Sequence, residues 1–232
     1  MPSALLVHGI ANGPGAMWRW QDWLTADGWD VTALALLGHG GRPAAPSYTL
    51  DAYGRDALAA GDFELVVGHS LGGATVTVAA ALRPEWAGRL VTVDPAWYIP
   101  SELLADARAE ELGGLDLTVE ELERRHPNWD SRDIRAKHEE ARRALPEAVG
   151  RTFEDNTDWD LRVRVRTLAM PTLLLTGEPA LGSIVPDALA ETAVSANPLI
   201  TWKRVAGAGH NPHRDQPEAT RAVLEEWLAA TA

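Results

Sequence analysis

Residues 63–73 read Phe-Glu-Leu-Val-Val-Gly-His-Ser-Leu-Gly-Gly, an apolar run that ends in a single serine, Ser70, set between glycines. Residues 63–67 have the composition of a buried strand, and residues 74–82 can form a buried helix. The pattern Gly-x-Ser-x-Gly between a strand and a helix predicts a sharp turn that presents the serine hydroxyl. The helix N-terminus behind the serine supplies an unpaired N–H and a positive dipole end, which favour an oxyanion. These features predict that Ser70 is a nucleophile; the alternative is an ordinary turn residue.

The rest of the chain alternates short apolar runs with helical patterns. Further strands are expected at residues 5–7, 30–36, 89–94, 171–176 and 199–205. Strands that alternate with helices predict an α/β fold with a mainly parallel sheet flanked by helices. Ligands of such sheets bind at the carboxyl ends of the strands, which is where Ser70 is expected to lie.

A long charged stretch, residues 98–167, interrupts this alternation and predicts an inserted helical lobe. The helices expected in it are residues 101–112 with Ser101 as the cap, a helix that begins at the capping box Thr118–Glu121, and residues 131–145, which begin at Ser131. We therefore divide the chain into a core of residues 1–97 and 168–232 and a helical cap of residues 98–167.

A histidine, His210, follows the last predicted strand in the loop Ala206-Gly-Ala-Gly-His-Asn-Pro-His213. An imidazole on this loop can reach the serine hydroxyl, remove its proton during attack and return the proton to the leaving group. The chain order, serine first and histidine last, is typical of one topology of hydrolase. We predict that His210 is the general base; the alternative is a polar surface residue.

Several motifs together resemble those of the α/β-hydrolase superfamily, specifically its small, cap-bearing, serine esterase-like branch, along nearly the whole chain. They are His8-Gly9, Gly38-His39-Gly40, Gly68 to Gly73, Val93-Asp94-Pro95 and Gly207-Ala208-Gly209-His210. The resemblance implies Ser70 as nucleophile and His210 as base, with the backbone N–H groups of Ile10 and Leu71 as the oxyanion hole. It also implies about six parallel strands, because the chain begins where the third strand of the full family sheet would be.

The acidic partner of the histidine departs from the commonest family pattern. Family members usually carry an aspartate shortly after the strand that follows the cap, where this chain has Ala180 or Gly182. Some members instead place the acid after the preceding strand, which makes Asp94 the first choice here. Glu178 is the alternative. The sequence leaves both open.

The predicted reaction is hydrolysis of a carboxylic ester of a small, largely apolar or aromatic substrate through an acyl-serine intermediate. Trp18, Trp97 and Tyr98 are expected to line the pocket beside the oxyanion loop and the lobe. A C–C bond hydrolase, a lyase or an acyltransferase could use the same residues, and a non-catalytic ligand-binding protein could use the same fold.

The amino-acid composition limits the kinds of ligand and partner that the protein is expected to bind. The net charge of −12 disfavours binding to nucleic acid, and the absence of cysteine excludes disulfides and thiolate metal sites. No metal-ligand spacing and no dinucleotide fingerprint is present, so we expect no cofactor and a small-molecule substrate. Neither a signal peptide nor a membrane span is recognisable, which predicts a cytoplasmic protein without membrane attachment, as a monomer or homodimer.

Overall fold

The structure, a computed structural model, describes residues 1–231 and contains a six-stranded parallel sheet of strand order β2-β1-β3-β4-β7-β8. The strands are β1 (Ser3–Val7), β2 (Asp30–Leu34), β3 (Phe63–His69), β4 (Ala87–Val93), β7 (Thr172–Thr176) and β8 (Ile200–Arg204). All neighbouring pairs run parallel, so the predicted fold class is confirmed. The central strands are continuous runs of buried aliphatic residues, as expected where helices cover both faces of a sheet.

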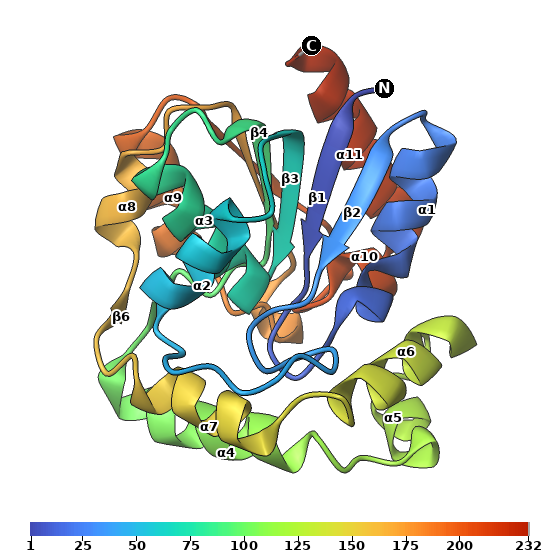
Figure 1. Ribbon diagram of the computed structural model, residues 1–232. Coiled ribbons are helices and arrows are strands. Elements are labelled where there is room, and N and C mark those ends of the chain that lie inside the picture. The colour runs from blue at the N-terminus through green and yellow to red at the C-terminus, as the bar shows by residue number, and fades with distance from the viewer. Residues whose placement is uncertain (232) are drawn as a thin grey trace.

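Helices cover the two faces of the sheet (Figure 1). One face carries α2 (Leu50–Leu58), α3 (Leu71–Leu82), α8 (Arg162–Arg166) and α9 (Asp187–Ala196), and the other carries α1 (Trp18–Ala26) and α11 (Pro217–Ala230). Alternate residues of a strand belong to two separate hydrophobic cores, because successive side chains point to opposite faces of the sheet. Leu5 and Val66 belong to the first core, whereas Leu6 and Val67 belong to the second. The longest helix, α11, has 14 residues, and no helix within residues 1–231 is long and apolar enough to cross a membrane.

Most of the stretch between β4 and β7 lies across the carboxyl ends of the strands, whereas its last helix, α8, lies on one face of the sheet (Figure 1). It consists of β5 (Tyr98–Ile99), a 3-10 turn (Ser101–Leu103), α4 (Leu104–Gly113), α5 (Val119–Arg125), α6 (Ser131–Ala141), α7 (Pro146–Glu154), β6 (Trp159–Asp160) and α8. β5 and β6 pair antiparallel, so the beginning and the end of the insertion lie side by side. This places α4 to α7 above the edge of the sheet at which the candidate site residues emerge.

Two helix predictions in the insertion are wrong in detail. The helix expected over residues 131–145 ends at Ala141, and α7 begins separately at Pro146. The residue before a proline is pushed out of the helical region, and Leu145 accordingly has φ −76° and ψ 124°. Ser101 begins a 3-10 turn rather than capping α4. The capping box of Thr118 and Glu121 is confirmed at the start of α5.

Candidate active site

The turn between β3 and α3 holds Ser70 in an unusual backbone conformation, with φ 54° and ψ −117°. Non-glycine residues rarely adopt a positive φ. Two glycines make the turn possible: a Cβ atom at Gly68 would lie 2.5 Å from the carbonyl oxygen of Gly72, and one at Gly72 would lie 2.2 Å from that of Val7. The predicted strand-to-helix turn is therefore present, and it brings Ser70 to the carboxyl edge of the sheet.

His210 and Asp94 meet in space although 116 residues separate them. The Nδ1–H of His210 donates a hydrogen bond of 2.6 Å to Oδ2 of Asp94, which is fully buried just after β4. The carboxylate also accepts hydrogen bonds from the Ser183 hydroxyl (2.5 Å) and the Ile184 N–H (2.9 Å). These bonds fix the carboxylate and leave Nε2 of His210 for proton exchange. In the described residues no hydrogen bond joins Ser70 to His210, and such pairs often tighten only when substrate binds.

Glu178, the alternative acid, lies elsewhere. Its carboxylate accepts a hydrogen bond of 2.7 Å from the backbone N–H of Gly207, three residues before His210. Glu178 therefore braces the start of the histidine loop, and Asp94 is the carboxylate that contacts the imidazole.

The loop after β1 runs close to the serine. A Cβ atom at Gly9 would lie 3.1 Å from the Cβ atom of Ser70. Within residues 1–231, the backbone N–H groups of Ile10 and Leu71 donate no hydrogen bond to another backbone group. Leu71 is the first residue of α3, where helix N–H groups lack intrahelical partners. Both N–H groups are thus available to an oxyanion at Ser70.

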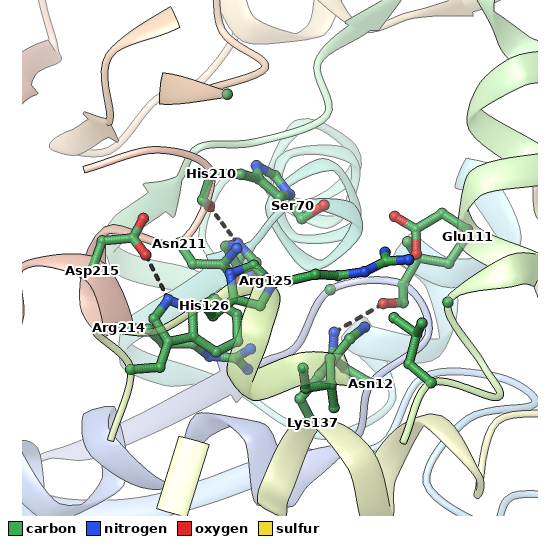
Figure 2. A pocket seen from close by; sticks show the side chains of 18 of the residues that line it. Asn12, Ser70, Glu111, Arg125, His126, Lys137, His210, Asn211, Arg214 and Asp215 are labelled. Atoms are coloured by element: carbon green, nitrogen blue, oxygen red, sulfur yellow. Dashed lines mark hydrogen bonds between the residues drawn. The ribbon is translucent and has the colours of Figure 1, made fainter. Parts of the chain in front are cut away.

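A polar cavity of about 350 Å³ lies on one side of Ser70 and His210 (Figure 2). His69 of β3 also lines it. The remaining polar or charged lining side chains come from other loops and helices and from the insertion: Asn12, Glu110, Glu111, Arg125, His126, Trp129, Lys137, Asn211, Arg214 and Asp215. Within residues 1–231, no group of three or more histidine or carboxylate side chains is placed to hold a metal ion.

A second, mainly apolar cavity of about 550 Å³ shares Ile10, Ser70 and His210 with the first. Its apolar lining comes mostly from the insertion and includes Tyr98, Ile99, Leu103, Ala107, Phe153 and Trp159. Ser70 and His210 therefore stand at the junction of a polar and an apolar space.

The tryptophans expected in the pocket lie elsewhere. Trp97 is fully buried and donates from Nε1 to the Thr77 hydroxyl (2.8 Å), because its side chain turns toward α3. Trp18 lies between α1 and α6, where its Nε1 donates to Asp133 (2.8 Å). The expectation of a pocket role for Trp18 and Trp97 is thus corrected, since neither is among the lining residues of the two cavities within the described chain, whereas Tyr98 lines the apolar cavity.

Two further histidines pack beside His210. The Nε2–H of His69 donates to the carbonyl oxygen of His210 (2.9 Å), and the two ring centroids are 4.8 Å apart. His213 lies 5.0 Å from the ring of His69. Burial lowers the pKa of both His69 and His213 well below the usual histidine range. Both rings are therefore neutral near pH 7. His69 holds the backbone of His210, and His213 packs against His69, without adding positive charge next to His210.

Charged residues of the insertion are the part of the site that the sequence analysis missed. Burial raises the pKa of Glu111 on α4 and lowers the pKa of Lys137 on α6, and each opposes the shift of the other through their attraction. Lys137 follows Asp133 by four residues and precedes Glu140 by three, so the three share one face of α6. This spacing could have indicated from the sequence that the three charged residues share a face, but it does not show which part of the fold that face contacts.

Comparisons with known proteins agree with this architecture. A sequence model described as the Alpha/beta hydrolase family matches residues 4–223. A crystal structure of E-2-(acetamidomethylene)succinate hydrolase superposes with a TM-score of 0.84 at 25% identity, covering 98% of this chain and 91% of that one. The pimeloyl-[acyl-carrier protein] methyl ester esterase of Photobacterium profundum is 29% identical over 177 residues, 70% of this chain and 69% of that protein. Lipase LipV of Mycobacterium tuberculosis is 47% identical over 72 residues, 28% of this chain and 27% of LipV.

Proposed function

This chain belongs to the alpha/beta hydrolase family, and we propose that it is a serine hydrolase that cleaves a carboxylic ester through an acyl-Ser70 intermediate. One observation carries the proposal: the buried carboxylate of Asp94 holds Nδ1 of His210 at 2.6 Å, and His210 lines the same two cavities as Ser70. The names of the relatives, an esterase, a lipase and a hydrolase of a succinate, support hydrolysis of a carboxylic acid derivative.

In the proposed mechanism, the Ser70 hydroxyl attacks the ester carbonyl while Nε2 of His210 takes its proton. Asp94 keeps the imidazole in the tautomer with the proton on Nδ1 and stabilises the imidazolium that forms. The negative charge on the carbonyl oxygen is stabilised by the N–H groups of Ile10 and Leu71. The bond to the alcohol then breaks, and the alcohol oxygen takes the proton from Nε2.

The second half of the reaction regenerates the enzyme. Nε2 of His210 removes a proton from a water molecule, and the oxygen of that water attacks the acyl carbon. The bond to the Ser70 oxygen breaks, the serine regains its proton from His210, and the carboxylic acid leaves. These steps require no cofactor, and Glu178 enters only by bracing the loop that carries His210.

The insertion, residues 98–167, is assigned the role of a cap that closes the site and selects a small substrate. Tyr98, Phe153 and Trp159 line the apolar cavity beside Ser70. Their rings suit an alkyl or aromatic group of the ester. This supports a small substrate with an apolar or aromatic part.

Turnover of a panel of p-nitrophenyl esters with acyl chains of two to ten carbons tests the proposal. We expect turnover by the native protein and a loss of at least about a thousandfold in kcat for Ser70→Ala. Ser101→Ala, an exposed serine of the insertion, is the matched control and retains activity. A folded protein without turnover of any ester would favour a C–C bond hydrolase, a lyase, an acyltransferase or a ligand-binding protein instead.

A further inference from the structure

Lys137 brings a positive charge into the polar cavity beside Ser70. It projects from α6, and its ammonium donates one hydrogen bond, of 3.1 Å, to the carbonyl oxygen of Ala11. A lysine ammonium carries three N–H donors, so two are left for other acceptors. Among the ion pairs within residues 1–231, none includes Lys137. Removing an ammonium partly from water without an ion-pair partner costs desolvation free energy. A bound anion would offset this free energy.

Two other charged residues lie deeper in the polar cavity, Arg214 and Asp215. The buried Arg214 lies 3.9 Å from Asp133 and has its guanidinium 4.7 Å from the centre of the Trp129 ring. Asp215 accepts hydrogen bonds from Trp129 Nε1 (2.6 Å) and from the N–H of Gly209 (2.9 Å). Asp215 is thus satisfied, whereas the buried Nε of Arg214 has no hydrogen-bond partner within residues 1–231, so Arg214 adds positive charge to the wall of the cavity. Lys137 is the half-buried cation of the cavity that forms no ion pair in the described residues.

Three more charged residues line the cavity. Arg125 is exposed on α5, and Figure 2 shows its side chain extending toward Glu111. Glu110 and Glu111 of α4 line both cavities. The carboxylates that line the cavity, Glu110, Glu111 and Asp215, offset most of the charge of its three cations. This disfavours a doubly charged group such as a phosphate monoester, because its second negative charge would be repelled. The balance fits a singly charged anion.

We propose that the polar cavity is a carboxylate-binding subsite in which the Lys137 ammonium, assisted by Arg125 at the mouth, holds a free carboxylate of the substrate. The inference rests on the serine hydrolase proposed above. The preferred substrate is then an ester that carries a carboxylate on one side of the scissile bond and an apolar group on the other, such as a half-ester of a short dicarboxylic acid. The carboxylate points into the polar cavity, and the apolar group occupies the cavity lined by Tyr98 and Phe153.

Selectivity between matched esters tests this assignment. The mono-p-nitrophenyl ester of glutaric acid carries a terminal carboxylate, and p-nitrophenyl valerate has a similar length without charge. We expect Lys137→Met to lower the ratio of their kcat/KM values, anionic over neutral, by about tenfold to a hundredfold, as for loss of a charge-assisted hydrogen bond. Lys137→Arg should keep most of the ratio, and Glu111→Gln should raise it, because it removes a nearby negative charge.

Arg135→Gln is the control for a general effect of charge. Arg135 is exposed on the same helix and lines neither cavity in the described chain, so the ratio should stay within about twofold of the native value. An unchanged ratio in Lys137→Met would overturn the proposal. An equal loss for both esters would also overturn it, since Lys137 would then act only by holding the Ala11 carbonyl.

A binding measurement separates this proposal from the proposed function. Calorimetric titration of Ser70→Ala with glutarate, which cannot be hydrolysed, should show binding that weakens at least about tenfold when Lys137→Met is added. Glutaramide, the uncharged diamide, should bind more weakly than glutarate. Glutarate binding without any esterase activity would contradict the proposed function alone. Absent glutarate binding in an active esterase would contradict the subsite alone.

Discussion

Within residues 1–231, three non-glycine residues have a positive φ, and all three lie at or next to residues of the candidate site: Ala11 (50°), Ser70 (54°) and Asp94 (40°). Such conformations cost of the order of 1–3 kcal/mol each and persist only where the surroundings enforce them. At Ser70 the close approach of Gly72 to the end of β1 enforces the turn. At Asp94 the strained backbone directs the carboxylate toward His210. The strain therefore lies at two residues that take part in the proposed reaction, Ser70 and Asp94, and at the residue that follows Ile10.

In the proposed mechanism Asp94 orients the imidazole and Glu178 only braces the loop, so replacing each carboxylate by its amide should lower kcat by very different amounts. Asp94→Asn should lower kcat by about ten-thousandfold, because the amide favours the wrong imidazole tautomer. Glu178→Gln should change kcat by no more than about threefold, since within residues 1–231 the Glu178 carboxylate accepts a hydrogen bond from the Gly207 N–H alone. Steady-state kinetics of both variants on one ester make the comparison. A larger loss in Glu178→Gln than in Asp94→Asn would transfer the role of acid to Glu178.

A buried histidine, His8, predicts sensitivity of the fold to acid. Its Nδ1–H donates to the Gly9 carbonyl (2.7 Å), and its Nε2 accepts from the Leu36 N–H (3.1 Å), so the ring must be neutral. Burial lowers the pKa of His8 to about 3. Between its unfolded pKa of about 6.5 and its folded pKa, only the unfolded chain binds this proton. Stability is thus lost as the pH falls through this window, by about 1.4 kcal/mol per pH unit.

His8→Gln, which keeps an acceptor for Leu36, should reduce the slope of the unfolding free energy against pH by about that amount between pH 6 and pH 4. Urea denaturation at several pH values measures the slope. An identical slope in the variant and the native protein would show that His8 is not kept neutral by the fold.

At the scale of single residues, the sequence predicted Ser70 and His210 because each stands in a short local motif. It could not choose between Asp94 and Glu178, because both follow sheet strands and the decision depends on which carboxylate the fold brings to the imidazole. Trp18 and Trp97 were predicted to line the pocket from their residue type and from their positions beside the oxyanion loop and the lobe, and neither gives the direction of a side chain.

One helix of the insertion, α6, connects the insertion to the rest of the fold through side chains on a single face. Asp133 is fully buried and accepts hydrogen bonds from Trp18 Nε1 (2.8 Å) and from Arg19 (2.5 Å). Glu140 accepts from the Gly15 N–H (3.2 Å), and Lys137 binds the Ala11 carbonyl. The face therefore holds the loop that carries the Ile10 N–H.

Neutralising Asp133 should weaken this connection strongly. Asp133→Asn leaves the buried cations Arg19 and Arg214 with one fewer negative partner, and we expect a loss of about 3–5 kcal/mol in the free energy of unfolding. Chemical denaturation measures the loss. The matched control is Asp22→Asn, which removes a half-exposed ion pair with Arg132 and should cost less than about 1 kcal/mol. Equal losses in the two variants would contradict the proposed link.

At the scale of elements, apolar periodicity and capping residues predicted the strands of the sheet and the start of α5. The break between α6 and α7 was signalled by Pro146, but the strongly helical composition on both sides favoured one continuous helix. Which face of each helix meets the sheet edge depends on the path of the whole insertion, so the contacts of α6 could not be predicted.

In the whole molecule, Ser70 lies between a polar and an apolar cavity. The apolar cavity predicts that the protein selects esters by the size of their apolar group. Ala107 of α4 lines the apolar cavity. Ala107→Trp should fill part of this space and lower kcat/KM for a long-chain or aromatic ester about tenfold more than for an acetate. Parallel kinetics on the two esters measure this ratio. Equal effects on both would show that the apolar cavity does not hold the substrate.

The central claim, that Ser70 is the nucleophile of a hydrolase, is tested most directly by a fluorophosphonate, which reacts with activated serines. Mass spectrometry of the digested protein should locate one adduct on the peptide that contains Ser70. The adduct should be absent in Ser70→Ala and should form much more slowly in Asp94→Asn. A folded native protein that forms no adduct, or an adduct that persists in Ser70→Ala, would contradict the account.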